Sequence, residues 1–114
     1  MPSKGTFYIT TPIYYPSDKL HIGHTYCTVA TDAMARYKRM RGFDVMFLTG
    51  VDEHGQKVAD SAAAHDMTPQ QWCDSQAPAF QELWRTLEIT NDDFIRTTQE
   101  RHIKAVQHFW EDLK

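Results

Sequence analysis

Cysteine is scarce in this sequence, and so are the features that mark secreted and membrane proteins. Only Cys27 and Cys73 occur, far apart and outside any CxxC pair, which fits neither a disulfide framework nor a zinc knuckle. No apolar run approaches the roughly 20 residues of a transmembrane helix, and no apolar signal segment follows the first residues. The sequence therefore predicts buried or unreactive thiols, no membrane segment and a cytoplasmic location.

An excess of positive charge is also absent. Lys and Arg total 12 against 15 Asp and Glu, which argues against a DNA-binding protein. Residues 1–57 nevertheless hold seven basic and five acidic side chains, whereas residues 58–114 hold five and ten, so an anionic ligand would meet a more favourable field in the first half. Four neighbouring basic residues fit either such a field or the solvated face of a helix: Arg36, Lys38, Arg39 and Arg41.

The 114 residues suffice for one small core and therefore for a single domain. Alternating β-branched and aromatic side chains at residues 6–11 predict a short, buried strand that stops at Pro12. The two prolines of residues 12–19 predict an ordered loop after it. The chain is thus expected to begin with a strand and a loop that leads into the next element.

From Ile22 onward, apolar side chains recur at steps of three and four and predict a helix that ends at the Arg41-Gly42 pair. Residues 44–50 predict a second strand, buried on both faces. Together these elements form a βαβ unit with parallel strands and a right-handed crossover. The predicted apolar stripe of the helix consists of Ile22, Tyr26, Val29, Ala33, Tyr37 and Met40.

The second half of the chain predicts mostly helix. Residues 56–65 are rich in alanine, and after a turn Thr68 begins another helix with a Thr-x-x-Gln capping box that Gln71 completes. Its apolar face is predicted to hold Trp72, Gln76, Phe80, Trp84 and Leu87. Pro78 lies inside this pattern and predicts a kink or a break, because proline lacks the N–H that the helix needs.

The last part of the sequence predicts a short strand at residues 92–96 and a helix opened by Thr97 and Glu100. That helix carries an apolar stripe without a stop signal, which suggests a truncated sequence: Ile103, Val106, Trp110 and Leu113. The three tryptophans fall on helical stripes and are expected in the core: Trp72, Trp84 and Trp110.

The most informative segment is HIGH, residues 21–24, where the loop enters the first helix. Free backbone N–H groups at a helix start attract anions, His21 and His24 add donors, and Gly23 has no Cβ to keep a flat ligand away. Such donors would stabilise the charge that develops in nucleotidyl transfer. The spacing alone also fits a metal pair or surface histidines, although a zinc helix would need HExxH and a third ligand.

Several blocks, in order, resemble one enzyme family. They are TTPIYYP at 10–16, KLHIGH at 19–24, ARYKRMRG at 35–42, FLTGVDEHGQK at 47–57 and DDFIRT at 92–97. These blocks resemble class I aminoacyl-tRNA synthetases, and among them the methionyl-tRNA synthetases. The resemblance implies an α/β fold in which residues 1–114 form the amino-terminal part of an incomplete Rossmann-type catalytic domain.

The resemblance also implies the roles of individual residues toward the amino acid. Ile13 and Tyr15 would line the pocket for the methionine side chain, and Asp52 would hold the α-ammonium group. These roles suit the chemistry, since a thioether favours an apolar, polarizable lining and an ammonium group favours a nearby carboxylate.

Toward ATP, the resemblance implies that His21 and His24 bind the phosphates as catalytic residues and that Gly23 makes room for the nucleotide. Methionine, ATP with Mg²⁺, and tRNA(Met) in the full-length enzyme are the implied substrates and partners. The chain is expected to contain no zinc ligands and to bind no DNA or membrane.

The second signature of the family, a KMSKS segment, is absent from these residues, so the chain alone is expected to be inactive. An open sheet edge also predicts poor folding in isolation. Two other functions remain open: an ATP-binding module related to nucleotidyltransferases, and a non-catalytic synthetase-like protein that only binds partners.

Overall fold

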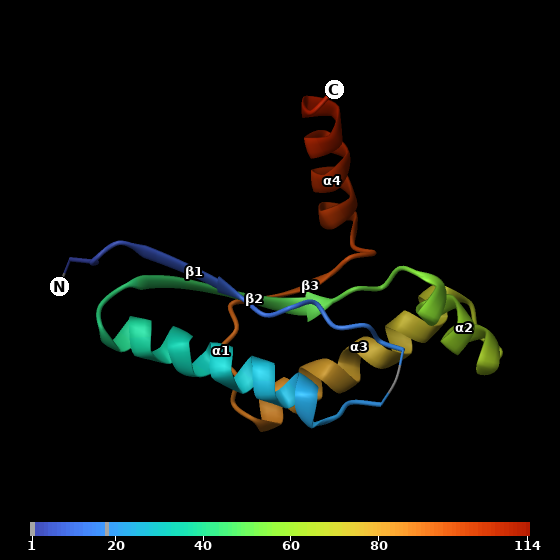
Figure 1. Cartoon of the computed structure of the whole chain (residues 1–114), viewed down its shortest axis with the longest axis horizontal. Coiled ribbons are helices and arrows are strands. Elements are labelled where there is room, and N and C mark those ends of the chain that lie inside the picture. Colours follow the sequence, from blue (N-terminus) through green and yellow to red (C-terminus); the bar gives the residue numbers. More distant parts are fainter. Residues whose placement is uncertain (1, 18) are drawn as a thin grey trace.

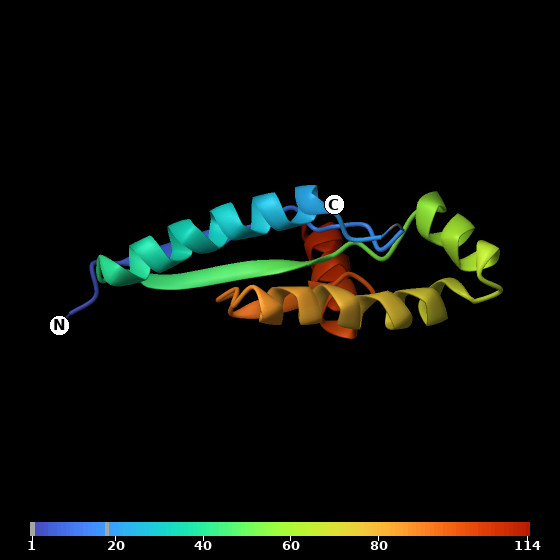
Figure 2. The ribbon, with the colours of Figure 1, turned by 90° about the horizontal axis from the view of Figure 1, so that it is seen from below.

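The computed structural model describes residues 2–17 and 19–114. Three parallel strands form one sheet in the order β1-β2-β3, which confirms the predicted α/β class with parallel strands. The elements, in chain order, are β1 (Thr6–Thr10), α1 (Ile22–Met40), β2 (Asp44–Val51), α2 (Gln56–Ala64), α3 (Pro69–Thr86), β3 (Asp93–Arg96) and α4 (Glu100–Asp112). Helices α1 and α3 lie on the same side of the sheet, and α4 projects from the other (Figure 1). Figure 2 shows α1 and α3 on either side of β2.

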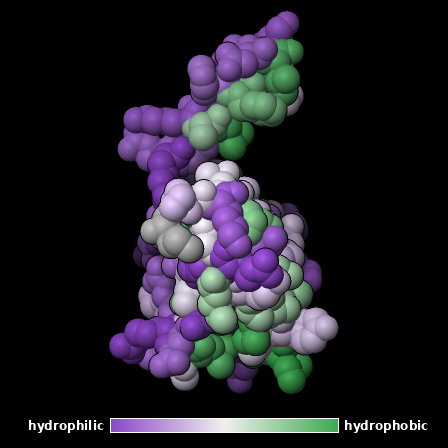
Figure 3. All heavy atoms as spheres, turned by 90° about the vertical axis from the view of Figure 1, so that its left-hand side faces the viewer, coloured by the Kyte–Doolittle hydropathy of each residue, from purple (hydrophilic) through white to green (hydrophobic). Residues whose placement is uncertain are grey.

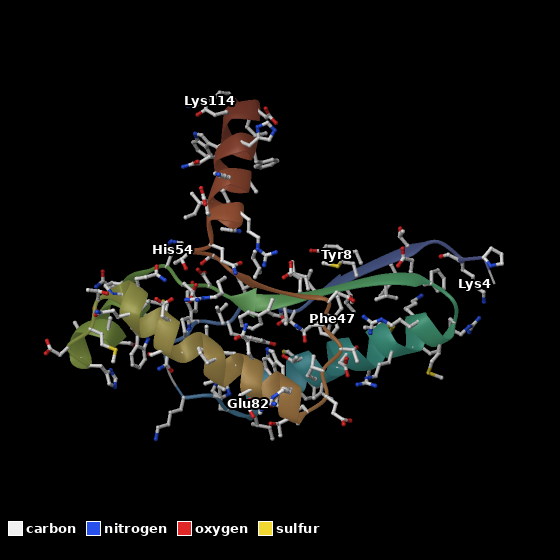
Figure 4. The ribbon with its side chains drawn as sticks, turned by 180° about the vertical axis from the view of Figure 1, so that it is seen from behind. Lys4, Tyr8, Phe47, His54, Glu82 and Lys114 are labelled. Atoms are coloured by element: carbon white, nitrogen blue, oxygen red, sulfur yellow. The ribbon has the colours of Figure 1, made fainter. Side chains whose placement is uncertain are left out.

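The central strand β2 is buried only in its second half. Phe47 and Val51 are fully buried, whereas the first residues of the strand are partly open, so burial on both faces is confirmed only near the carboxyl end. The edge strand β1 alternates between exposed and half-buried residues, and Tyr8 is 61% exposed. Tyr8 lies on the side of the sheet from which α4 projects (Figure 4). The prediction that this strand is buried is therefore wrong, because the helices cover only one face of the sheet.

The boundaries predicted for α1 are correct, but the predicted buried face is wrong. Ile22 of the apolar stripe is 85% exposed, and the residues that α1 buries are Thr28, Asp32 and Ala35. Polar contacts decide the orientation of the helix. The Asp32 carboxylate accepts hydrogen bonds from the backbone N–H and the hydroxyl of Thr90 at 2.8 and 2.6 Å, which fastens the segment before β3 to α1.

Helix α3 begins as predicted, with Thr68 and Gln71 forming a reciprocal capping box. It continues through Pro78 to Thr86, so the helix is not broken there. Its buried face holds Trp72, Cys73, Ala77, Phe80 and Trp84, which confirms two of the three tryptophans as core residues. Val51 of β2 packs with Phe80 and Trp84 in the main apolar cluster.

Both cysteines are free thiols in the structure. Cys73 is buried, and burial, together with the charge of Glu53, raises the pKa of its thiol to about 11. Because a thiol with so high a pKa is protonated at neutral pH, Cys73 is a poor nucleophile. This agrees with the predicted buried thiol.

Helix α4 has no buried residues and stands apart from the rest of the structure, with one apolar and one polar side (Figure 3). Trp110, predicted in the core, is 63% exposed. The prediction that Thr97 opens the helix is also wrong: the cap residue is Gln99, without a side-chain capping bond. Thr97 is instead buried, and its hydroxyl accepts a hydrogen bond from the backbone N–H of Glu53 at 2.8 Å.

Candidate functional site

A cavity of about 260 Å³ lies where the loop after β1 meets the start of α1. Its lining residues are Ile13, Tyr14, Tyr15, Ser17, His21, His24 and Lys57. Four residues predicted from the sequence thus surround one hollow: Ile13, Tyr15, His21 and His24. A second hollow of about 350 Å³, lined by Gly55 and Gln56, shares Tyr15 and Lys57 with the first. The combined space offers an aromatic wall, two imidazoles and one ammonium group to a ligand.

The two histidines of HIGH cap α1 reciprocally. The Nδ1 atom of His21 accepts a hydrogen bond from the N–H of Gly23 at 3.0 Å, and the Nδ1 atom of His24 accepts one from the N–H of His21 at 3.1 Å. The ring centroids lie 4.0 Å apart. Two backbone N–H groups of this junction, those of His21 and Gly23, are therefore bonded to imidazoles, and the expectation of an anion site at the helix start stays a prediction.

Gly23 lies directly beneath the His21 ring. A Cβ atom at this position would be 2.7 Å from Cε1 and 2.9 Å from Nδ1 of His21, closer than real Cβ contacts come. Space at Gly23 is thus already taken by the side chain two residues earlier. Its predicted role toward a nucleotide stays a prediction.

Tyr14 is a site residue that the sequence reasoning missed. Its carbonyl accepts a hydrogen bond from Asp52 N–H at 2.9 Å, and its hydroxyl is 2.9 Å from the Thr28 hydroxyl. Its ring meets His24 edge-on at 5.1 Å and stacks on Phe80 at 6.2 Å. Burial raises the pKa of the Tyr14 phenol, against the opposing effect of the Thr28 hydrogen bond.

Tyr14 and its two neighbours all border the cavity, but they differ in burial. Tyr14 forms a parallel bridge with Val51 at the end of β2 and packs against the main apolar cluster. Ile13 and Tyr15 are more exposed. Because all three side chains are apolar or aromatic, no sequence pattern shows which of them packs against the core.

Asp52, like Gly23, is a predicted site residue that does not line this cavity. Its Oδ1 atom accepts a hydrogen bond from His54 N–H at 3.3 Å and lies 3.5 Å from the Thr97 hydroxyl. It is nevertheless joined to the lining through its backbone N–H, which bonds to Tyr14. Asp52 thus follows β2 at the carboxyl end of the strand, next to the site rather than in its wall.

The loop that carries Asp52 is held by an ion pair that the sequence did not reveal. The buried Glu53 carboxylate accepts hydrogen bonds from Nε and Nη2 of Arg96 at 3.0 and 2.9 Å and from the Thr98 hydroxyl at 2.7 Å. Arg96 also contacts Asp74 of α3 at 2.6 Å. Because these partners lie more than 20 residues apart, no local pattern could have indicated them.

The four basic residues near the end of α1 each contact another residue of the chain, while Arg36 and Arg41 remain exposed. Arg36 pairs with Asp32 at 2.8 Å, and Arg39 bonds to Thr90 and Asp92. Lys38 lies over the rings of Phe7 and Phe43 at 4.8 and 4.7 Å, and Arg41 over that of Tyr37.

Among residues 2–17 and 19–114, no group of three or more His, Cys, Asp or Glu is arranged to hold a metal ion. Within the same residues, no helix has the length and apolar character needed to cross a membrane.

The sequence is similar to one protein family and to individual members of it. The family described as tRNA synthetases class I (M) matches residues 7–114. A methionine–tRNA ligase from Halalkalibacterium halodurans is 65% identical over 108 residues, covering 95% of this chain and 16% of the relative. A methionine–tRNA ligase from Bacillus subtilis is 60% identical over 114 residues, covering 99% of this chain and 17% of that relative. The chain thus spans about a sixth of the length of these curated relatives.

A solved structure is similar in fold as well as in sequence. Mycobacterium tuberculosis methionyl-tRNA synthetase in complex with methionyl-adenylate superposes with a TM-score of 0.92 at 44% identity. The match covers 94% of this chain and 21% of that one. The arrangement of strands and helices described above is therefore that of a stretch of a known synthetase.

Proposed function

Because this chain belongs to the family of tRNA synthetases class I (M), we propose that it supplies the first part of the catalytic domain of a methionine–tRNA ligase. The observation that carries the proposal is the cavity at HIGH, which Ile13, Tyr15, His21 and His24 line together. Within a longer enzyme, this segment activates methionine with ATP and serves tRNA(Met) charging in the cytoplasm. The chain by itself lacks a KMSKS segment and is inactive.

The proposed reaction begins with methionine in the hollow. The thioether contacts Ile13 and Tyr15, whose exposed side chains offer an apolar and polarizable surface. Asp52, at the carboxyl end of β2 where open parallel sheets bind ligands, pairs with the α-ammonium group. The amino acid is thereby held with its carboxylate directed toward HIGH.

The nucleotide occupies the part of the site formed by His21, Gly23 and His24. ATP enters as its magnesium complex, and the histidines donate hydrogen bonds to its phosphates. A methionine carboxylate oxygen forms a bond to the α-phosphorus while the bond to pyrophosphate breaks, which yields methionyl-adenylate and pyrophosphate. Positioning and charge stabilisation carry this step. A ribose hydroxyl of the terminal adenosine of the tRNA then takes the acyl group, and AMP leaves.

A chimeric enzyme tests the proposal in a complete catalytic domain. This chain replaces the matched 114 residues of the Bacillus subtilis ligase, to which it is 60% identical, and methionine-dependent ATP–pyrophosphate exchange is measured. We expect activity in the chimera and none in the chain alone. Tyr15→Ala should raise KM for methionine at least tenfold, whereas Tyr26→Ala, exposed on α1 outside the cavity, should leave it unchanged.

Other results would point to the alternative functions. A chimera that retains ATP binding but loses methionine selectivity favours a nucleotidyltransferase-like module. A folded chimera that binds neither methionine nor ATP favours a non-catalytic binding protein. Exchange activity in the unmodified chain would contradict the stated inactivity.

A further inference from the structure

We propose that Gly23 is a positioning residue that acts through His21: it leaves room for the imidazole to cap α1, and the cap fixes His21 and His24 as neutral rings with the proton on Nε2. The inference rests on the proposed function, since it defines how the same site presents its donors to ATP. It differs from making room for the nucleotide, because the group accommodated is a side chain of this protein.

A side chain at position 23 would collide with the His21 ring. A Cβ at Gly23 would lie under 3.0 Å from two atoms of the His21 ring. Apart from residues 22 and 24 and the backbone of α1 itself, no other heavy atom lies within 4 Å of that Cβ position. The ring is the movable partner, so a side chain at Gly23 would push it off the helix start. The hydrogen bond from Gly23 N–H to Nδ1 would then be lost.

The two capping hydrogen bonds also determine which ring nitrogen carries the proton. A nitrogen that accepts a hydrogen bond from a backbone N–H carries no proton of its own, and a neutral imidazole has one N–H. Both Nδ1 atoms accept such bonds, so the proton of each ring is on Nε2. The histidines therefore act on phosphate as neutral Nε2–H donors, and the cap selects the tautomer before any ligand arrives.

Helix propensity alone predicts the opposite effect of Gly23→Ala on stability, so the two explanations can be distinguished by experiment. Alanine is a better helix former than glycine, so Gly23→Ala should stabilise α1 unless the His21 ring is in the way. His21→Ala removes that ring together with its capping bond. The effect of Gly23→Ala must therefore change sign between the two backgrounds.

A double-mutant cycle tests this coupling in the 114-residue chain, or in the chimera if circular dichroism shows that the isolated chain does not fold. Thermal unfolding is measured for the unsubstituted chain, Gly23→Ala, His21→Ala and the double variant. We expect Gly23→Ala to lower the unfolding midpoint in the unsubstituted chain and to raise it in the His21→Ala background. Equal shifts in both backgrounds would overturn the inference.

A spectroscopic measurement keeps the inference falsifiable if a variant does not fold. Long-range ¹H–¹⁵N spectra of the ¹⁵N-histidine-labelled unsubstituted chain, at neutral pH and without ligand, should show the Nε2–H tautomer for His21 and His24. A predominant Nδ1–H or doubly protonated form of His21 would overturn the assignment. His65 is an internal reference of the opposite kind, because its Nδ1 lies 2.8 Å from the Ser61 carbonyl oxygen and must carry the proton.

The catalytic consequence is measured in the chimera. Gly23→Ala should lower kcat for ATP–pyrophosphate exchange at least tenfold and change KM for methionine less than twofold, since only the phosphate donors move. If the parent chimera shows no methionine-dependent exchange, the proposed function fails while the cycle and the spectra still stand. If exchange is intact but the cycle is additive, only this inference fails.

Discussion

Among individual residues, Glu53 shows how the loop at the end of β2 is held in place. Its side chain is fully shielded from solvent and accepts hydrogen bonds from Arg96 and Thr98. The same Arg96 also pairs with Asp74, whose side chain is 55% exposed. One guanidinium group thus has a buried and an exposed carboxylate partner, which allows their contributions to be compared directly.

Glu53→Gln should lower the free energy of unfolding by about 2–4 kcal/mol, because removing one member of a buried ion pair leaves the other without its compensating charge. Asp74→Asn, the matched control on the same Arg96, should cost no more than about 1 kcal/mol, as exposed pairs do. Urea denaturation of the two variants measures the difference. Equal losses would mean that the buried partner contributes no more than the exposed one.

The residues found from the sequence are those in contiguous blocks, and the ones missed act over long separations. HIGH and the residues around Tyr15 could be read from short segments, and the structure places them around one cavity. The Glu53–Arg96 pair joins residues 43 positions apart, and only the fold brings them together. Tyr14 lies within one of these blocks, but its role depends on packing against Phe80 of α3, which no local pattern shows.

At the scale of secondary structure, the order and type of the elements followed from hydrophobic periodicity, but the buried face of α1 did not. Periodicity shows which residues share a face of a helix, not which face meets the sheet. In α1 the deciding contacts are the hydrogen bonds from Thr90 to Asp32, made by a segment far along the chain. Burial raises the pKa of the Asp32 carboxyl, but the hydrogen bonds from Thr90, together with the hydrogen bond and charge of Arg36, hold that pKa below its usual value.

Helix α3 accommodates a proline that the sequence predicted would distort it. Pro78 is exposed, and inside a helix it costs both the hydrogen bond that it cannot donate to the Asp74 carbonyl and the close approach of its ring to that carbonyl. Pro78→Ala restores this donor and should raise the free energy of unfolding by about 1–2 kcal/mol, after subtraction of the entropy that proline removes from the unfolded chain.

Urea denaturation measures this effect, and Ala79→Gly at the adjacent exposed position is the control. That change should lower stability by about 1 kcal/mol, as glycine does inside helices. An unchanged or lower stability of Pro78→Ala would show that the packing of α3 against Val51 depends on the backbone shape that the proline imposes.

As a whole, the molecule is flat, with principal extents of 54 × 41 × 17 Å. The sheet is covered on one face by α1 and α3 (Figure 2), and α4 is tied to it near its base through Arg101, which pairs with Asp93 at 2.6 Å. His54 lies near that base (Figure 4). The core between β2 and α3 is therefore expected to unfold as a unit, and α4 to open independently of it.

Native-state hydrogen exchange of the 114-residue chain tests this division. A helix of 13 residues without buried side chains is marginal in water, so amides from Ile103 onward should open with less than about 1 kcal/mol. Amides in the second half of β2, such as that of Phe47, should instead be protected up to the free energy of global unfolding. Arg101→Ala should reduce protection only in the first turn of α4 and leave β2 unchanged. Equal protection in α4 and β2 would show that the apolar side of α4 is covered in solution, because an uncovered 13-residue helix cannot supply that protection from its own hydrogen bonds.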